Sequence, residues 1–200
     1  MRRIVQSFAV IGLLALGACG GGGSVLSFDT NTNPDRVIVT TVGPSNIARV
    51  LPGASIALSA TAVRGSQNGL VNVNRYTWSA AVTVGGTYIA NTDGQTKPCA
   101  TLVFTPTGGT PVAFAPDYSI YIAIDPTNEA NILFIPPTAV ALPAGAPAGS
   151  TVTVANPAFP PVVGSTNPYC VVVTATPRGG SAANAGSITV AVVNPNNPLN

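Results

Sequence analysis

Short runs of alternating apolar and polar residues, punctuated by proline and glycine, constrain the fold of this chain more than any other feature. In 55–63, for example, Ile56, Leu58 and Ala60 fall on one side of the chain and Ser59 falls on the other. A period of two is that of a strand with one buried face. The same pattern predicts strands at 36–42, 55–63, 75–81, 100–105, 119–124, 131–135, 150–154, 169–176 and 187–193.

The segments between these runs carry turn residues and no convincing helix. The chain contains 21 glycines and 19 prolines, and pairs such as Pro52-Gly53 and Gly179-Gly180 mark turns. The nearest helix candidate, 182–185, is short and flanked by glycine. Short strands without helices predict an all-β fold, and specifically an antiparallel sandwich of two sheets.

The two ends of the predicted sandwich resemble a known family. Residues 37–81 hold a strand, a Leu-Pro-Gly turn, a second strand and the segment Tyr-Thr-Trp-Ser, and residues 169–193 hold two strands joined by a glycine turn. Together they resemble the first three strands and the closing hairpin of bacterial immunoglobulin-like domains of group 2. The resemblance implies an antiparallel Ig-like β-sandwich over 36–194, with Trp78 in the core and a long insertion at about 82–168 between the third strand and the closing hairpin. Two small sandwiches in tandem, divided near residue 112, are the alternative.

The N-terminal residues have the features of an export signal. Arg2 and Arg3 precede an apolar stretch, 4–16, that suits a signal peptide and is shorter than the roughly 20 residues that span a bilayer. The stretch ends in Leu-Gly-Ala-Cys19, which resembles the bacterial lipobox. The resemblance implies a signal peptide over 1–18 and lipidation of Cys19 by diacylglycerol with palmitate-type acyl chains. An ordinary secretory signal with a chance cysteine is the alternative.

A tether is predicted between the lipid and the folded part. Residues 19–35 begin with the lipidated cysteine and a run of glycines and continue with Ser, Thr and Asn, which is typical of a flexible linker. Gly20 follows the cysteine, and the resemblance to enterobacterial sorting rules implies the outer membrane. The predicted location is therefore the cell envelope, lipid-anchored, with the domain facing the periplasm or the surface. Residues 195–200 form a C-terminal tail.

Cys99 and Cys170 remain once Cys19 is lipidated. In an oxidising envelope they are expected to form a disulfide, which closes a long loop and contributes about 4 kcal/mol by loop-closure entropy. By strand alternation Cys99 shares a side with Thr101, and Cys170 shares a side with Thr174. Both cysteines are therefore predicted on the outer, more polar faces, where the bridge would pin the insertion across the outside of the sandwich. The bridge also crosses the tandem boundary, which favours a single unit.

Composition argues against several kinds of chemistry. The chain has no histidine and only 7% charged residues, which excludes histidine-based triads and the common zinc sites and leaves no basic patch for nucleic acid. Lysine-based catalysis would need Lys97, which lacks a Ser-x-x-Lys spacing. Paired carboxylates would come from Asp117, Asp125 and Glu129, yet a straight strand over 119–124 would hold the two aspartates roughly 25 Å apart. Asp125 is predicted to cap a turn instead.

One spacing resembles a metal loop. Asp29, Asn31, Asn33 and Asp35 alternate oxygen ligands as calcium loops do. Pro34 stands where such a loop needs glycine, so a polar linker is favoured over a calcium site.

Aromatic side chains gather in or near the predicted insertion. They either fill a small core beneath a long loop or line a surface on which a carbohydrate or peptide could stack, and the first alternative is favoured. The residues are Tyr88, Phe114, Tyr118, Tyr121 and Phe159.

These observations predict a non-catalytic cell-envelope lipoprotein that is not an enzyme and uses no cofactor. The expected role is an Ig-like binding or spacer module tethered to membrane lipid through Cys19, with a protein or a glycan as the class of ligand and no nucleic acid. A structural subunit of a surface assembly, such as a fibre or a layer, is the alternative. A carboxylate- or metal-dependent enzyme is the least favoured.

Overall fold

The computed structural model describes residues 34–43, 48–64, 69–71, 73, 75–89, 94–155, 168–178 and 182–193. The chain divides into two units, Met1–Thr30 and Asn31–Asn200, and every described residue belongs to the second. The predicted signal peptide, Cys19, nearly all of the predicted tether and the tail therefore lie outside the described residues. None of the described helices has the length and apolar character needed to cross a membrane.

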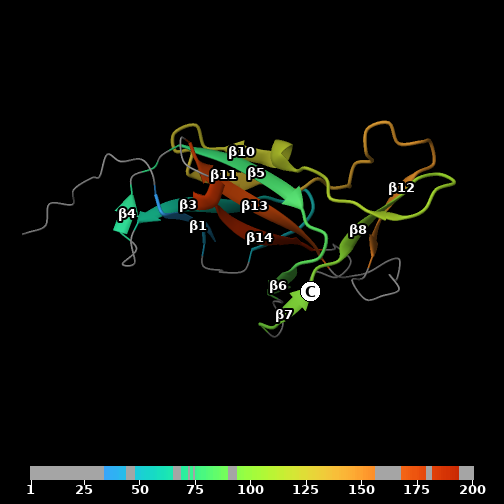
Figure 1. Ribbon diagram of the computed structural model, residues 1–200, viewed down its shortest axis with the longest axis horizontal. Helices are drawn as coiled ribbons and strands as arrows, with labels where there is room; N and C mark the ends of the chain where they lie inside the picture. The colour runs from blue at the N-terminus through green and yellow to red at the C-terminus, as the bar shows by residue number, and fades with distance from the viewer. Residues whose placement is uncertain are drawn as a thin grey trace, which may run out of the picture. The chain divides into compact units, whose positions relative to one another are not determined.

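One sheet is centred on β3 (Ile56–Arg64), which lies between β1 (Arg36–Thr41) and β11 (Asn131–Phe134) (Figure 1). The edge strand β10 (Ile122–Ile124) pairs with β11, and the short β4 (Gly69–Val71) also pairs with β3. All these pairs are antiparallel. Because β10 and β11 come from the predicted insertion, that stretch supplies two strands of this sheet.

The second sheet contains the closing hairpin. It has the order β2 (Arg49–Val50), β14 (Gly186–Val192), β13 (Tyr169–Pro177) and β5 (Tyr76–Val82). The hairpin and the pairing of β13 with β5 are antiparallel, whereas β2 joins β14 in parallel. Strands from both sides of residue 112 therefore share each of the two sheets.

Apolar side chains of the two sheets form one core. Leu58 and Phe134 of the first sheet and Val171, Val173 and Val190 of the second are fully buried in it. Residues of β5 alternate between buried and exposed along its whole length, which is the burial expected of a strand with one face on a core. The alternation seen in the sequence therefore marks the packed faces.

Two contacts show how closely the strands around this core approach. Trp78 is buried, as predicted, and its indole nitrogen donates a 2.7 Å hydrogen bond to the carbonyl of Glu129 in the loop before β11. Gly186 starts β14 against β1, and a Cβ there would overlap the backbone carbonyl of Val37. Only a residue without a side chain fits this approach.

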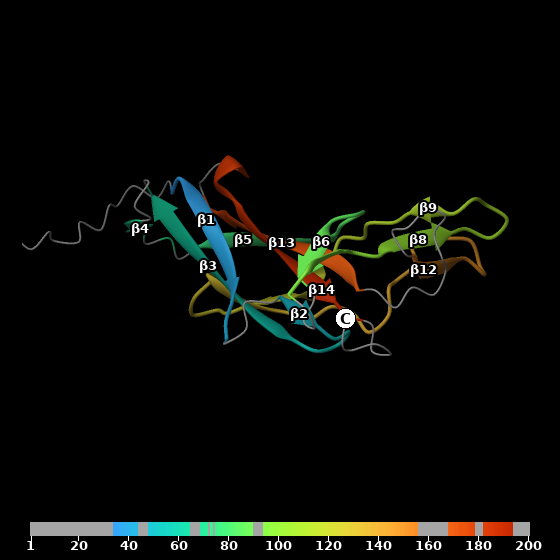
Figure 2. The same ribbon diagram turned by 90° about the horizontal axis from the view of Figure 1, so that it is seen from below.

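Two smaller sheets complete the described structure. In one, β8 (Thr101–Thr105) lies between β12 (Thr151–Ala155) and β9 (Val112–Ala113), and Figure 2 shows these strands grouped together. In the other, β6 (Thr87–Ile89) pairs with β7 (Thr96–Pro98). All pairs in the two small sheets are antiparallel.

The three-stranded sheet joins the sandwich at one end. Ala100 forms an isolated parallel bridge with Tyr169, and Leu102 of β8 is fully buried in the main core. Val152 and Val154 of β12 pack partly against the same core. One face of this sheet is thus an extension of the core.

The predicted fold class is confirmed, since the chain is all-β and its sheets are antiparallel apart from β2. Eight of the predicted strands have ends within one residue of those observed. The ninth, 119–124, begins as the 3-10 turn Ser119–Tyr121 before β10. The helix candidate at 182–185 contains only the 3-10 turn Ala182–Asn184. The strands that the pattern missed have two or three residues each, which is too short for an alternation to be recognised.

Candidate functional site

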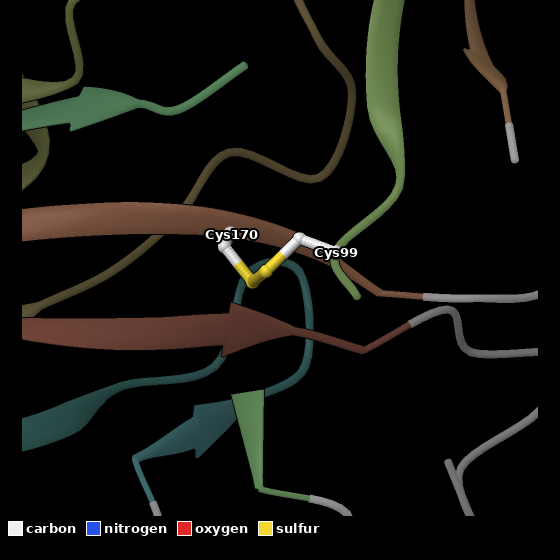
Figure 3. The surroundings of a disulfide bond; sticks show 2 residues. All are labelled: Cys99 and Cys170. Carbon is white, nitrogen blue, oxygen red and sulfur yellow. A yellow bond between two sulfur atoms is a disulfide. The ribbon is translucent and has the colours of Figure 1, made fainter. Parts of the chain in front are cut away.

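A disulfide joins Cys99, which follows β7, to Cys170 of β13 (Figure 3). Their Cα atoms are 5.7 Å apart, and both side chains are fully buried. With Tyr88 and Ala191 they form a second apolar cluster, separate from the main core. The bridge therefore ties the segment after β5 to the outer face of the second sheet, as predicted. The prediction of polar surroundings is wrong, because β6 places Tyr88 in contact with this face.

Backbone hydrogen bonds next to the disulfide hold the β6–β7 hairpin. The N–H of Cys99 donates to the carbonyl of Gly86 over 3.0 Å, which closes the base of the hairpin. The N–H of Thr83, just after β5, donates to the carbonyl of Cys170 over 3.0 Å. These links and the disulfide together fix the position from which Tyr88 reaches the second sheet.

Arg49 of β2 lies beside this cluster. It pairs with Ala191, which in turn pairs with Cys170, so the three residues form one row across the second sheet. The guanidinium carbon of Arg49 is 6.0 Å from the centre of the Tyr88 ring, which is a cation–π distance. Both terminal nitrogens of Arg49 are buried, and neither has a hydrogen-bond partner in the described part of the chain. Burial lowers the pKa of Arg49, and Tyr88 partly opposes this, but a guanidinium stays charged at neutral pH.

A groove of about 380 Å³ opens beside Tyr88. Residues of β6, β7 and β14 line the groove, together with Ala48. The wall combines hydroxyl groups with apolar side chains: Thr87, Thr96, Thr189, Tyr88, Ile89 and Ile188. Such a mixture suits an organic ligand that has both a polar and an apolar part.

A larger groove, of about 480 Å³, lies on the first sheet around β10, β11 and the end of β1. Leu133 stands between Ala57 and Ala123 in the register of the sheet, and all three line the groove. Leu133 is 43% exposed and Ile124 is 41% exposed. This face therefore presents apolar side chains to solvent within the described structure.

The two aspartates considered for catalysis are each bound within their own turn. Asp117 accepts hydrogen bonds from the hydroxyl and the N–H of Ser119, at 2.6 and 2.8 Å. Asp125 accepts the same two bonds from Thr127, at 2.6 and 2.8 Å. These bonds hold the pKa of both carboxyls below the usual value. The turn predicted at Asp125 is confirmed.

The other two polar candidates lie on different elements. Glu129 forms a 3.4 Å ion pair with Arg178, and Lys97 lies on β7 opposite Tyr88. Of the four residues with the spacing of a calcium loop, only Asp35 is within the described residues, together with the intervening Pro34. No cluster of three metal-binding side chains (His, Cys, Asp or Glu) occurs in the described part of the chain.

The four described aromatic residues of this set pack in cores, as favoured, but three of them pack with the main core and only Tyr88 belongs to a small separate cluster. Tyr118 is buried, with edge-to-face ring contacts to Tyr121 at 5.2 Å and to Tyr169 at 6.4 Å between ring centres. Phe114 packs partly against the main core, and Tyr88 belongs to the disulfide cluster. Burial raises the pKa of Tyr118 and of Tyr169. Phe159 lies outside the described residues.

Sequence reasoning missed Arg49. The only signal in the sequence was that Arg49 is the single charged residue within the apolar stretch 47–51. That pattern does not indicate which residues from distant parts of the chain surround Arg49. The parallel pairing of β2 with β14 brings Arg49 to Tyr88, and no local pattern predicts that pairing. No protein-family model, no curated protein and no solved structure matches this chain.

Proposed function

We propose that this chain is a non-catalytic cell-envelope lipoprotein, in which an Ig-like β-sandwich tethered to the membrane through Cys19 serves as a binding or spacer module. The order of the strands in the two sheets supports the Ig-like part of the proposal. The first sheet runs β1-β3-β11-β10 and the second contains β5-β13-β14, while immunoglobulin constant domains order their sheets as ABED and CFG. Assigning A to G to β1, β3, β5, β10, β11, β13 and β14 satisfies both orders and follows the chain.

The position of the tryptophan supports the same assignment, and the remaining differences lie outside the seven assigned strands. Trp78 is buried on β5, the strand that corresponds to C, where immunoglobulin domains carry their core tryptophan. The additional strands β6 to β9 come between C and D, and β12 comes between E and F. The disulfide differs from the B–F bridge of antibody domains, because it joins the C–D segment to F on the outer face.

The step from the sandwich to a binding role is an analogy at the level of the fold, and the grooves support it. The larger groove has a wall of mostly apolar side chains with a few polar groups, and the smaller one combines hydroxyl groups with apolar side chains. Apolar walls that include a few polar groups are typical of sites that hold a ligand. Asp117 and Asp125 are bound within their own turns, and Glu129 pairs with Arg178. These carboxylates are thus engaged in structure.

Lipid labelling tests the anchoring part of the proposal. The full chain is expressed in a bacterial host supplied with an alkyne analogue of palmitate. We expect label on the natural chain, none on Cys19→Ser, and full label on the matched control Cys99→Ser/Cys170→Ser. Label that persists in Cys19→Ser would refute lipidation at that residue. Protease treatment of intact cells then distinguishes a surface domain from a periplasmic one.

A structural subunit of a surface assembly is the second candidate, and the larger groove favours it. The exposed side chains of Leu133 and Ile124 could be covered by another copy of the chain, as exposed apolar patches often are. Sedimentation of the full chain in mild detergent tests this candidate. A mass that rises with protein concentration and stays monomeric in Leu133→Ser would support it, and a constant monomer mass would reject it.

A further inference from the structure

We propose that the groove beside Tyr88 binds a carboxylate on a small, partly apolar ligand, of the kind found at the C-terminus of a short peptide, and that Arg49 is the anchoring cation. The inference rests on the proposed role as a binding module and names the chemistry of its ligand. Arg49 lies at one end of the row that it forms with Ala191 and Cys170 on the second sheet, and the inference makes it the residue that binds the ligand's carboxylate.

The first step concerns the charge of Arg49. Its two terminal nitrogens are buried and have no hydrogen-bond partner in the described part of the chain. A buried charge is unfavourable unless it is paired and hydrogen-bonded. Among the described carboxylates, those of Asp117 and Asp125 are held in their own turns, and that of Glu129 pairs with Arg178. Asp35 lies next to β1, in the other sheet. An anion from outside the chain would satisfy the guanidinium.

The second step concerns which anion fits. The planar fork of a guanidinium matches the two oxygens of a carboxylate or a phosphate. Beside Tyr88, whose ring lies against the guanidinium, the groove offers threonine hydroxyls and the apolar side chains of Ile89 and Ile188. One positive charge balances one carboxylate, and the apolar wall suits a small side chain attached to it. The hydroxyls of Thr96 and Thr189 can bond the amide group that precedes a C-terminal carboxylate.

The third step concerns access. Tyr88 both lines the groove and lies over the guanidinium, whereas the terminal nitrogens of Arg49 are covered. A ligand therefore reaches the terminal nitrogens when the Tyr88 ring turns aside. The disulfide and the Cys99–Gly86 hydrogen bond hold the base of the hairpin, and neither involves the Tyr88 ring. Both links would therefore remain when the ring turns. Binding should thus change the environment of Tyr88.

Ligand titration of the full chain, purified in mild non-ionic detergent, tests the proposal. The probes are N-acetyl-dialanine, its C-terminal amide and inorganic phosphate, followed by calorimetry and by the ring resonances of Tyr88. We expect the acid to bind, to shift the Tyr88 resonances, and to bind at least tenfold more tightly than the amide or phosphate. Equal binding of acid and amide, tighter binding of phosphate, or no binding of the acid would overturn it.

Variants then locate the site. Arg49→Gln should weaken binding of the acid at least tenfold, whereas the matched control Arg64→Gln, on β3 of the other sheet, should leave it unchanged. Thr189→Val keeps the shape of the wall and removes one hydroxyl, so it should weaken binding severalfold. This variant decides the matter if Arg49→Gln does not fold, and unchanged binding in it would overturn the site. Failure here with intact lipid label on Cys19 refutes the carboxylate site alone.

Discussion

The sandwich and the β6–β7 hairpin are stabilised by different means. In the sandwich, strands of up to nine residues bury complete rows of side chains, such as Leu58, Val171 and Val173. The hairpin has two strands of three residues each and is held through a disulfide and the small cluster around Tyr88. An isolated two-stranded hairpin is marginal in water. Long alternating strands are therefore stabilised by burial in a shared core, whereas this short separate hairpin is held by a covalent link and a small cluster.

Removing the disulfide should have the largest effect on stability and should act mainly on the β6–β7 hairpin. The Cys99→Ser/Cys170→Ser variant is expected to lose about 4 kcal/mol of unfolding free energy, because loop-closure entropy is returned to the unfolded chain. Urea unfolding of the natural and variant chains measures the loss. Amide exchange should rise first in β6 and β7. Coincident unfolding curves and unchanged exchange would contradict the stabilising role given to the bridge.

Truncation of one leucine in the core should have the next largest effect. Leu58→Ala removes a fully buried side chain and should reduce the free energy of unfolding by about 3 kcal/mol through lost burial and a cavity. The matched control, Leu133→Ala on the neighbouring strand, removes a side chain that is 43% exposed and should cost less than about 1 kcal/mol. Equal losses in the two variants would show that the first sheet does not pack with Leu58 inward.

The close approach of β14 to β1 predicts a smaller loss. Gly186→Ala should destabilise the chain by about 2 kcal/mol, because its Cβ would overlap the carbonyl of Val37 and the strands must move apart. Gly145→Ala is the control, with open space around the Cβ but a φ of +76°, and should cost about 1 kcal/mol. Thermal unfolding measures both. A Gly186→Ala variant as stable as the natural chain would be inconsistent with this contact.

Alkaline pH should destabilise the core of the sandwich, whereas pH near neutrality should leave its stability unchanged. Burial raises the pKa of Tyr76 in the core to about 12, from a reference value of 10.0. The folded chain thus keeps its proton where the unfolded chain loses it. Stability is fully present below pH 10 and falls between pH 10 and 12, by about 1.4 kcal/mol per pH unit for one such group.

The pH dependence of urea unfolding measures this effect, with Tyr76→Phe as the control. The variant should lose part of the alkaline slope, and the remainder is assigned to Tyr118 and Tyr169, whose pKa values are also raised by burial. The same slope in both chains would mean that the hydroxyl of Tyr76 titrates equally in the folded and unfolded states.

Local patterns predicted the parts of the molecule whose structure is decided locally. Eight alternating runs correspond to strands, and the ninth corresponds to a 3-10 turn followed by β10. The turn at Asp125 was predicted correctly, and Trp78 is buried as the family resemblance implied. The pairing of Cys99 with Cys170 followed from counting cysteines, yet their surroundings did not. Strand alternation placed both on outer faces, and it carries no information about a hairpin that covers such a face. Tyr88 provides that cover.

By itself, the sequence determined that this protein folds as a β-structure with its apolar sides turned inward. The reason is that alternation is a property of neighbouring residues, so it is the same whichever strands pair with one another. The tertiary structure alone decided that β10 and β11 belong to the first sheet and that β2 runs parallel to β14. It also decided that Arg49 meets Tyr88. These contacts join segments far apart in the chain, and their energies depend on the packing of both sheets, which no single segment encodes.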